Sequence, residues 1–432
     1  MHTDVVVIGA GVVGASVALE LARAGHAVTV VDKGGGVGFG STSASSAIVR
    51  FNFSTRAGVA AAWESQHQWR CWSRHLGVDV GERARFEQVG LAFLDVDSMP
   101  RSATLPLFDE LGVPYREWTS AELKQRIPGV SAGRYWPPSR IDDERFWHES
   151  HAELGAVYTP DAGYVTDPLL AAQNLAAAAR HHGTQFRFRA AVEAIEQEHG
   201  RVAGVVLADG ARIGCPVVVN AAGPWSSAVN AKAGVGADFS VRTRPLRQEV
   251  AYVPAARCPA RGEGDAIMIA DLDLGTYTRV ESGGGLLVGG TEPECDPLAW
   301  VHDPDQVNYA PTAAVFTAHA TRAAKRRPGL TVPNRPRGIV GVYDVTEDWT
   351  PIYDRSELDG FYLAIGTSGN QFKNAPVIGK FLTAIIEQTE AGIDHDTTPV
   401  QFVGEHTGVR IDLSAFSRRR RVDPGAAKSV VG

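Results

Sequence analysis

The sequence predicts an α/β fold in which a Rossmann-like dinucleotide-binding domain is interrupted by a second domain, built on a mixed or antiparallel β-sheet. Residues 4–32 carry the pattern of a nearly complete βαβ unit with a glycine-rich turn. Several strand-like segments between residues 241 and 291 follow one another without helices, which is typical of an antiparallel or mixed sheet. A chain of 432 residues also exceeds the usual size of a single core, so two domains are expected.

The βαβ unit contains the strongest local motif. Val5–Ile8 is a β-branched run typical of a buried parallel strand, and Gly9, Gly11 and Gly14 follow it with the spacing G-x-G-x-x-G at the start of an apolar-periodic helix. The first glycine makes the turn, the second lets the backbone approach a pyrophosphate, and the third lets helix and strand pack closely. Val28–Val31 is expected to be the second strand.

Asp32 follows this second strand at about the distance expected for the acid that accepts a ribose hydroxyl. The helix N-terminus offers free N–H groups and a positive dipole end to phosphates. A purely structural turn is the alternative. Strand, helix and acid occur in register, however, and this favours dinucleotide binding.

The remaining elements are expected in order along the chain. They are a Gly/Ser-rich loop over 34–46, a helix over 58–76, a strand over 86–96, a helix over 169–182, a hairpin over 200–216, a buried strand over 217–220, a strand over 361–365, a loop over 366–373 and a helix over 375–387. We expect a discontinuous nucleotide-binding domain (1–86, 150–236 and 336–400), a substrate domain (87–149 and 237–335) and a C-terminal extension (401–432).

Composition narrows the class of protein. A formal net charge of −7 provides no basic field for nucleic acid. The four cysteines, Cys71, Cys215, Cys258 and Cys295, are scattered without a C-x-x-C pair, and the histidines lack metal-ligand spacing. We therefore expect a reduced, cytoplasmic protein without metal, signal peptide or membrane span. The basic run Arg418–Arg421 is expected to be a solvated tail.

Five segments together resemble the D-amino-acid oxidase superfamily of flavoproteins. They are VVVIGAGVVGASVALELARAG (5–25), GSTSASSAIVR (40–50), GYVTDP (163–168), VVVNAAGPWS (217–226) and GFYLAIGTSGNQFKNAPVIG (360–379). Within the superfamily the chain looks most like the branch of sarcosine oxidase, dimethylglycine dehydrogenase and glycine oxidase. The resemblance spans nearly the whole chain in the right order. It implies FAD as the cofactor, and a large antiparallel sheet over the flavin.

The resemblance also implies which residues contact the FAD. These are Gly9, Gly11, Val12, Val13, Gly14, Asp32, Lys33, Ser41, Thr42, Ser43, Ser45, Ser46, Val192, Ala222, Gly223, Trp225, Gly341, Gly369, Gln371 and Phe372. Asp32 stands where relatives often have Glu. For the segment around Ala222 and Gly223, a buried strand and tight turn without ligand contacts is the alternative interpretation.

Arg50 and Lys373 match the two cations that hold the substrate carboxylate in sarcosine oxidase-like proteins. A guanidinium binds a carboxylate in a bidentate manner, so the pair is a sensible anchor for an amino acid. The alternatives are a solvated lysine and an arginine in a structural ion pair. Tyr277 and Asn370 are further candidates for the substrate site, although a tyrosine on a half-buried strand more often serves packing.

Three departures from the relatives bear on the chemistry. Gly341 and Ala44 stand near the places of a cysteine and a histidine that link flavin covalently, so the resemblance implies non-covalent FAD. Leu287 stands near the place of a lysine that helps to activate oxygen, which favours a dehydrogenase over an oxidase. Asn370 replaces a common histidine, which leaves the substrate range open.

The expected activity is oxidation of the C–N bond of a secondary or N-alkyl amino acid. Hydride would pass to flavin N5, and the resulting imine would hydrolyse. The partners are then a small amine or amino acid and an electron acceptor, either oxygen or another carrier. Three alternatives remain: an FAD-dependent tailoring oxidase or 2-hydroxy acid dehydrogenase, a flavoprotein that serves as an assembly factor, and a nicotinamide-dependent dehydrogenase.

Overall fold

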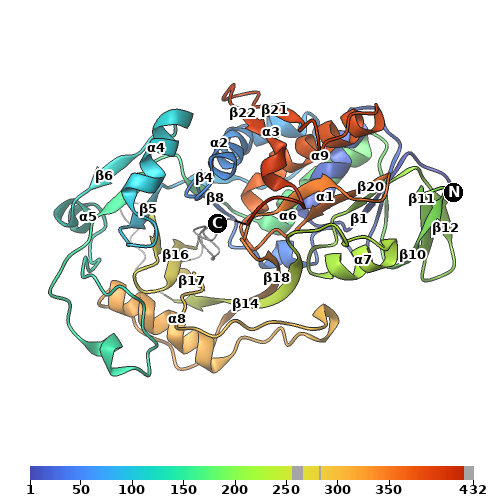
Figure 1. The fold of residues 1–432 in the computed structure, drawn as a ribbon. Coiled ribbons are helices and arrows are strands. Elements are labelled where there is room, and N and C mark those ends of the chain that lie inside the picture. Colours follow the sequence, from blue (N-terminus) through green and yellow to red (C-terminus); the bar gives the residue numbers. More distant parts are fainter. Residues whose placement is uncertain (255–265, 282–283, 423–432) are drawn as a thin grey trace.

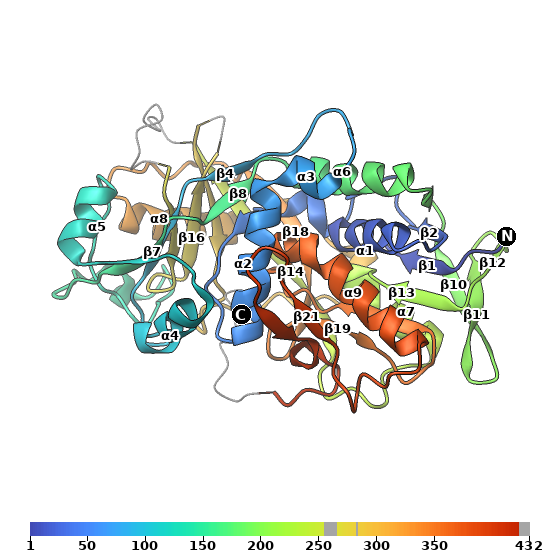
Figure 2. The same cartoon turned by 90° about the horizontal axis from the view of Figure 1, so that it is seen from above.

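The structure, a computed structural model, describes residues 1–254, 266–281 and 284–422. Two large sheets lie side by side along the long axis of the molecule. Figures 1 and 2 show strands β10–β12 at one end of this axis and helices α4 and α5 at the other. Cys258 lies outside the described residues, and the other three cysteines are free thiols. The described part of the chain has no helix of the length and apolar character needed to cross a membrane.

The first sheet is the predicted Rossmann-like unit. Within the described residues its strands run in the order β19 (Ile352–Arg355), β20 (Phe361–Ile365), β13 (Val217–Asn220), β1 (Val5–Ile8), β2 (Val28–Val31) and β9 (Gln185–Arg187). All neighbours are parallel except β19, which is antiparallel to β20. The βαβ prediction is therefore confirmed, with its helix at Val12–Arg23.

Alternating residues of β1 supply the two faces of this sheet. Val5 and Val7 pack under helices α1 (Val12–Arg23), α6 (Pro168–His181) and α9 (Ala375–Glu390). Val6 and Ile8 face a second cluster beneath a small meander and helix α7. The meander consists of β10 (Val192–Glu198), β11 (Arg201–Leu207) and β12 (Arg212–Gly214), and α7 spans Ser226–Ala233. Burial on both faces explains the uninterrupted apolar run in the sequence.

The second sheet is mixed, as predicted, and lies beside the nucleotide-binding sheet. Its described strands are ordered β18 (Gly338–Thr346), β14 (Thr243–Val253), β17 (Leu286–Gly290), β16 (Thr276–Val280), β15 (Met268–Asp271), β5 (Leu91–Leu94), β7 (Ala156–Thr159) and β6 (Arg116–Trp118). Only the pairing of β15 with β5 is parallel among these strands as described. Helix α8 (Ala313–Arg326) packs on it through Phe316, Ala320 and Ala323.

The remaining helices and strands lie outside the two large sheets. They are α2 (Arg56–Arg70), α3 (Trp72–Leu76), β3 (Ile48–Val49), β4 (Phe86–Gln88), β8 (Gly163–Val165), α4 (Arg101–Leu111), α5 (Ser120–Arg126) and the hairpin β21 (Gln401–Val403) with β22 (Arg410–Asp412). The large sheet includes β7 and β18, whereas the expected boundaries put both strands in the nucleotide-binding domain. Strand pairing over long separations is not encoded in local pattern.

Three sequence predictions require correction. The single helix over 58–76 is two helices, because the chain leaves helical geometry at Cys71 (φ −108°, ψ 37°). The strand over 86–96 is two strands in different sheets, separated at Gly90, whose φ of +75° and contact with the Tyr158 ring suit only glycine. The hairpin over 200–216 is part of a three-stranded meander that begins at Val192.

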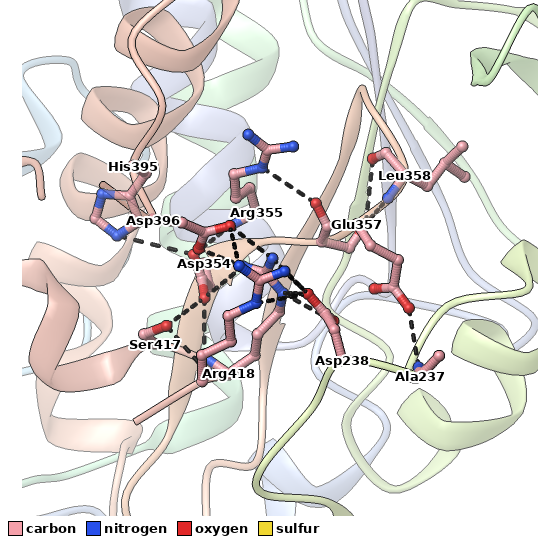
Figure 3. A network of polar contacts seen from close by, with 12 residues as sticks. Ala237, Asp238, Asp354, Arg355, Glu357, Leu358, His395, Asp396, Ser417 and Arg418 are labelled. Atoms are coloured by element: carbon pink, nitrogen blue, oxygen red, sulfur yellow. Dashed lines mark hydrogen bonds and ion pairs between the residues drawn. The ribbon is translucent and has the colours of Figure 1, made fainter. Parts of the chain in front are cut away.

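The prediction of a solvated basic tail is wrong for Arg418 and Arg420. Arg418 is fully buried and forms ion pairs with Asp238, Asp354 and Asp396, as Figure 3 shows. Arg420 pairs with the buried Asp348. These carboxylates come from distant segments, so the basic run ties the end of the described chain to the nucleotide-binding sheet. Arg419 and Arg421 remain exposed.

Candidate functional site

A cavity of about 540 Å³ runs between the two sheets. Its wall includes the turn after β1, the end of β2, the serine-rich loop, strands β14, β16 and β18, and the segment that leads into α9. Of the residues predicted to bind cofactor or substrate, Gly14 and Ser43 do not line it, and all the others do. Gly14 instead packs beneath the turn, and Ser43 is exposed with its hydroxyl donated to the Gly40 carbonyl.

The glycine turn is shaped by contacts that a side chain would destroy. A Cβ on Gly14 would lie 1.9 Å from the Gly9 carbonyl oxygen, and one on Gly9 would lie 2.3 Å from that of Ala221. Gly11 has more room, since its Cβ would meet only the Thr42 hydroxyl at 3.2 Å. The glycines therefore bring β1, β13 and α1 together, and they leave the N-terminus of α1 facing the cavity.

Asp32 is held at the end of β2 by two backbone amides. Ala10 N donates to Oδ2 at 2.7 Å and Gly34 N donates to Oδ1 at 2.6 Å. Each carboxylate oxygen retains a second lone pair, so the side chain can still accept a ribose hydroxyl. The same contacts fix the carboxylate beside the glycine turn.

The serine-rich loop contains a short 3-10 helix, η1 (Ser41–Ala44), between the two sheets. Thr42 Oγ1 accepts the amide of Val12 at 3.0 Å, which ties the loop to the start of α1. Ser41 donates to the Val342 carbonyl at 2.5 Å, and the Ser46 and Tyr277 hydroxyls lie 2.7 Å apart. The loop thus connects the glycine turn with the large sheet along one side of the cavity.

Arg50 and Lys373 meet at the other end of the cavity. The Arg50 guanidinium carbon lies 5.1 Å, and the Lys373 ammonium 4.7 Å, from the centre of the Phe53 ring. Arg50 also donates to the Asn52 carbonyl, and Lys373 to that of Asn370. Only 3% of Lys373 is exposed, so the alternative of a solvated lysine is wrong.

Burial of these two cations has an electrostatic cost. Desolvation lowers the pKa of Arg50 to about 10. It also lowers the pKa of Lys373 well below its ordinary value, and the nearby Arg50 charge adds to this effect. A bound anion would offset both desolvation and mutual repulsion. The arrangement is therefore suited to a ligand that carries a carboxylate.

Two half-buried tyrosines, Tyr277 and Tyr343, complete this end. The Tyr277 ring lies across Gly289, whose Cβ would come within 2.2 Å of it, and the Tyr343 ring lies against Gly369 in the same way, at 2.3 Å. Desolvation raises the pKa of Tyr277 to about 12 and that of Tyr343 well above its usual range, so both phenols are neutral. Tyr343 was not predicted from the sequence. Its signal was the alternation along β18, which puts it on the same face as Gly341.

Comparison with known proteins identifies the family. The sequence profile of the family described as FAD dependent oxidoreductase matches residues 4–385. The chain belongs to this family. The FAD-dependent oxidoreductases most similar to it in sequence include 4-methylaminobutanoate oxidase (formaldehyde-forming) of Paenarthrobacter nicotinovorans, 26% identical over 96% of this chain and 48% of that protein. Glycine oxidase of Geobacillus kaustophilus is 24% identical over 90% and 94%.

Human mitochondrial sarcosine dehydrogenase is 28% identical over 84% of this chain and 37% of its own length. The chain therefore spans about half or less of two of these relatives, and nearly all of glycine oxidase. Among solved structures, L-proline dehydrogenase from P. horikoshii superposes with a TM-score of 0.74, at 23% identity and 97% coverage of both chains. Glycine oxidase from Geobacillus kaustophilus superposes with a TM-score of 0.72, at 22% identity and coverage of 98% of this chain and all of that one. These likenesses establish the fold.

The cavity of this FAD-dependent oxidoreductase fits its cofactor. The turn through Gly9 and Gly11, the N-terminus of α1 and Asp32 form one end, and together they suit a pyrophosphate and a ribose. Described His, Cys, Asp and Glu side chains nowhere gather in threes that could hold a metal ion. Leu287 does not line the cavity, so its predicted place beside the flavin is wrong. Leu287 lies on β17, between strands β14 and β16, and pairs there with Tyr252 and Arg279.

The segment that precedes α9 is held by a buried acid, Asp344, which was not predicted from the sequence either. Asp344 accepts the Gly366 amide at 2.7 Å through Oδ2, and its carbonyl accepts the Ser368 amide at 2.8 Å. Desolvation raises the pKa of Asp344 to about 7. Asn370 donates to the Trp349 carbonyl and accepts from Gln371, so its amide is oriented by the protein.

Proposed function

We propose that this chain oxidises the C–N bond of a secondary or N-alkyl amino acid. The observation that carries the proposal is the pair of buried cations, Arg50 and Lys373, against one ring at the end of a cavity whose opposite end suits a dinucleotide. The named substrates of the relatives support it. Glycine, sarcosine and 4-methylaminobutanoate each combine an amine with a carboxylate.

Substrate binding follows from these contacts. The carboxylate pairs with the Arg50 guanidinium and the Lys373 ammonium, and the amine end extends toward Tyr277 and Tyr343. Both cations are already held in place by backbone carbonyls, so little ordering is required on binding. The neutral phenols leave the amine free of an ion pair, which favours its uncharged form.

The protein's part in the chemistry is orientation and exclusion of water. FAD, when bound, supplies the acceptor for the hydride that leaves the carbon next to nitrogen. Loss of that hydride from the neutral amine gives an iminium ion, and addition of water then splits this ion into a carbonyl compound and an amine, with release of a proton. No side-chain base is needed once the amine is uncharged.

We further propose that FAD is held without a covalent bond. Gly341 and Ala44 are adjacent, since a Cβ on Gly341 would lie 3.0 Å from the Ala44 Cβ, and neither side chain is a nucleophile. Acid precipitation should therefore release all the flavin into the supernatant. Flavin that stays with the pellet would contradict this part of the proposal.

We also propose a dehydrogenase that passes electrons to a carrier other than oxygen. Among the described residues that line the substrate end, the lysine is Lys373, which is assigned to the carboxylate. Reduced enzyme should be reoxidised slowly by air and quickly by an artificial acceptor such as a quinone. Fast reoxidation by air alone would indicate an oxidase.

The decisive experiment is anaerobic reduction by a panel of compounds. N-methyl amino acids, cyclic secondary amino acids and glycine are compared with 2-hydroxy acids of the same carbon skeleton. Bleaching of the flavin absorbance by the amines alone supports the proposal. Bleaching by hydroxy acids alone would assign a 2-hydroxy acid dehydrogenase, and no bleaching by any carboxylate would favour a larger substrate or an assembly role.

A further inference from the structure

One segment of the substrate domain reaches across to the nucleotide-binding sheet. We call residues 299–312, between β17 and α8, the strap; in Figure 1 it is the orange segment that runs out below β14. One leg pairs with β14 through Arg247 N to the Ala299 carbonyl and Val301 N to the Pro245 carbonyl, both at 2.9 Å. The strap therefore starts from a rigid strand.

The other leg is fixed to the same strand by side chains. The Arg247 guanidinium donates to the Asn308 and Ala310 carbonyls, both at 2.9 Å. The buried Glu249 carboxylate accepts the Thr312 amide at 2.7 Å. Because both legs are bound to β14, the position of the tip between them is determined by the sheet.

The tip of the strap is a short 3-10 helix, η4 (Pro304–Gln306), capped by Asp303. Asp305, at its centre, forms an ion pair with Lys33 and accepts the Trp225 indole N–H at 3.1 Å. The Lys33 ammonium in turn lies 4.0 Å from the centre of the Trp225 ring. Asp305, Lys33 and Trp225 all line the cavity.

The two partners of Asp305 follow two strands of one sheet, and their side chains contact each other at one end of the cavity. Lys33 directly follows Asp32 after β2, and Trp225 ends the 3-10 helix η3 (Gly223–Trp225) after β13. These segments belong to the nucleotide-binding sheet, whereas Asp305 belongs to the substrate domain. An opening of this end of the cavity must therefore break both contacts of Asp305.

We propose that the strap is a clasp that slows the release of FAD, with Asp305 as its closing residue. The ion pair is partly exposed, at 38% for Lys33 and 60% for Asp305, and such pairs contribute little to folding stability. The ion pair instead slows the escape of the cofactor, because it joins the strap to the nucleotide-binding sheet at this end of the cavity. Asp305 is a positioning residue and takes no part in the oxidation.

The test is the rate of FAD release from the holoenzyme. Purified protein is diluted into excess FAD-free buffer, and the rise of free-flavin fluorescence is followed. Asp305→Asn retains an oxygen that can accept the Trp225 N–H and loses the charge, and we expect release about 2–5 times faster. Asp305→Ala loses both contacts, and we expect about 3–10 times faster release.

Three controls make the result specific. Glu294→Gln removes one exposed negative charge from the segment just before the strap and should release FAD at the wild-type rate. Lys33→Glu should speed FAD release. The double variant Lys33→Glu with Asp305→Lys should return the release rate toward that of the wild type. Added KCl to 1 M should speed release from the wild type more than from Asp305→Ala.

Release from Asp305→Ala within twofold of the wild type would overturn the proposal. So would an equal acceleration in Glu294→Gln, or a charge exchange that restores nothing. Melting of the apoprotein is recorded in parallel, and a loss of stability in Asp305→Ala apoprotein without faster FAD release counts against the clasp.

Discussion

Arg50 and Lys373 stand at opposite ends of the chain, yet their cationic groups lie 5.1 and 4.7 Å from the centre of the same Phe53 ring. Neither is a surface residue, and both retain lowered pKa values through burial. A bound carboxylate would offset the cost of burying two like charges together.

Replacement of either cation should weaken substrate binding specifically. For Lys373→Met and Arg50→Ala we expect KM for a carboxylated amine to rise about 10- to 100-fold, because a charge-assisted hydrogen bond worth about 1.5–3 kcal/mol is lost. FAD content, measured by absorbance, should stay near one per chain. Steady-state kinetics check the prediction, and unchanged KM in both variants would exclude the carboxylate anchor.

The lowered pKa of Lys373 should appear in the pH dependence of substrate affinity. The carboxylate pairs with the protonated ammonium, so affinity is highest below the pKa and falls as the pH rises through it. Because burial holds this pKa well below 10.5, KM should rise at a lower pH than a solvated lysine would allow. A KM profile over pH 6–10 measures it. Lys373→Met should abolish this inflection.

Asp344 should make folding stability fall as the pH rises. Its pKa is raised from 3.8 to about 7 by burial, so the folded state binds a proton that the unfolded state has lost. Its favourable contribution is complete below about pH 4 and is lost as the pH rises through about 7, by up to about 4 kcal/mol. Asp344→Asn can still accept the Gly366 amide and lacks this titration. Melting of both proteins from pH 4 to 8 compares them, and parallel curves would refute the prediction.

The glycine turn offers a test of the βαβ geometry. Gly14→Ala would put a methyl group 1.9 Å from the Gly9 carbonyl, so we expect loss of FAD binding and destabilisation by about 3 kcal/mol or more. Gly35→Ala is the matched control in the same region, since its Cβ would meet nothing within 4 Å. Chemical denaturation and flavin content distinguish the two variants.

The buried arginine near the end of the described chain should matter more for stability than its neighbour. Arg418→Met leaves the buried Asp354 without its arginine partner (Figure 3), which costs about 3–5 kcal/mol. Asp238 and Asp396 keep Arg419 as an ion-pair partner. Arg419→Met, whose side chain is 49% exposed, should cost less than about 1 kcal/mol. Urea denaturation compares them, and equal effects would show that burial of Arg418 carries no special weight.

Local pattern was sufficient for part of this fold. The βαβ unit around Gly9 and Asp32 follows from spacing and residue type, because its strand, glycine turn, helix and acid all lie within residues 4–32. The helix broken at Cys71 and the strand divided at Gly90 were missed, since a break that is decided by the packing of distant partners leaves little local trace. Tyr343 and Asp344 were missed for a similar reason, as their importance depends on what β18 faces.

By itself, the sequence determined the class of fold, the dinucleotide-binding turn and the candidate pair Arg50 and Lys373. Tertiary structure alone decided that the pair is buried against one ring, that Leu287 stays out of the cavity wall, and that Asp305 reaches Lys33 and Trp225. The physical reason is range. Backbone preferences of strands, turns and helices act over a few residues, so a short stretch of sequence reveals them. Burial, charge pairing and the closure of a cavity depend on segments that meet only when the chain is folded.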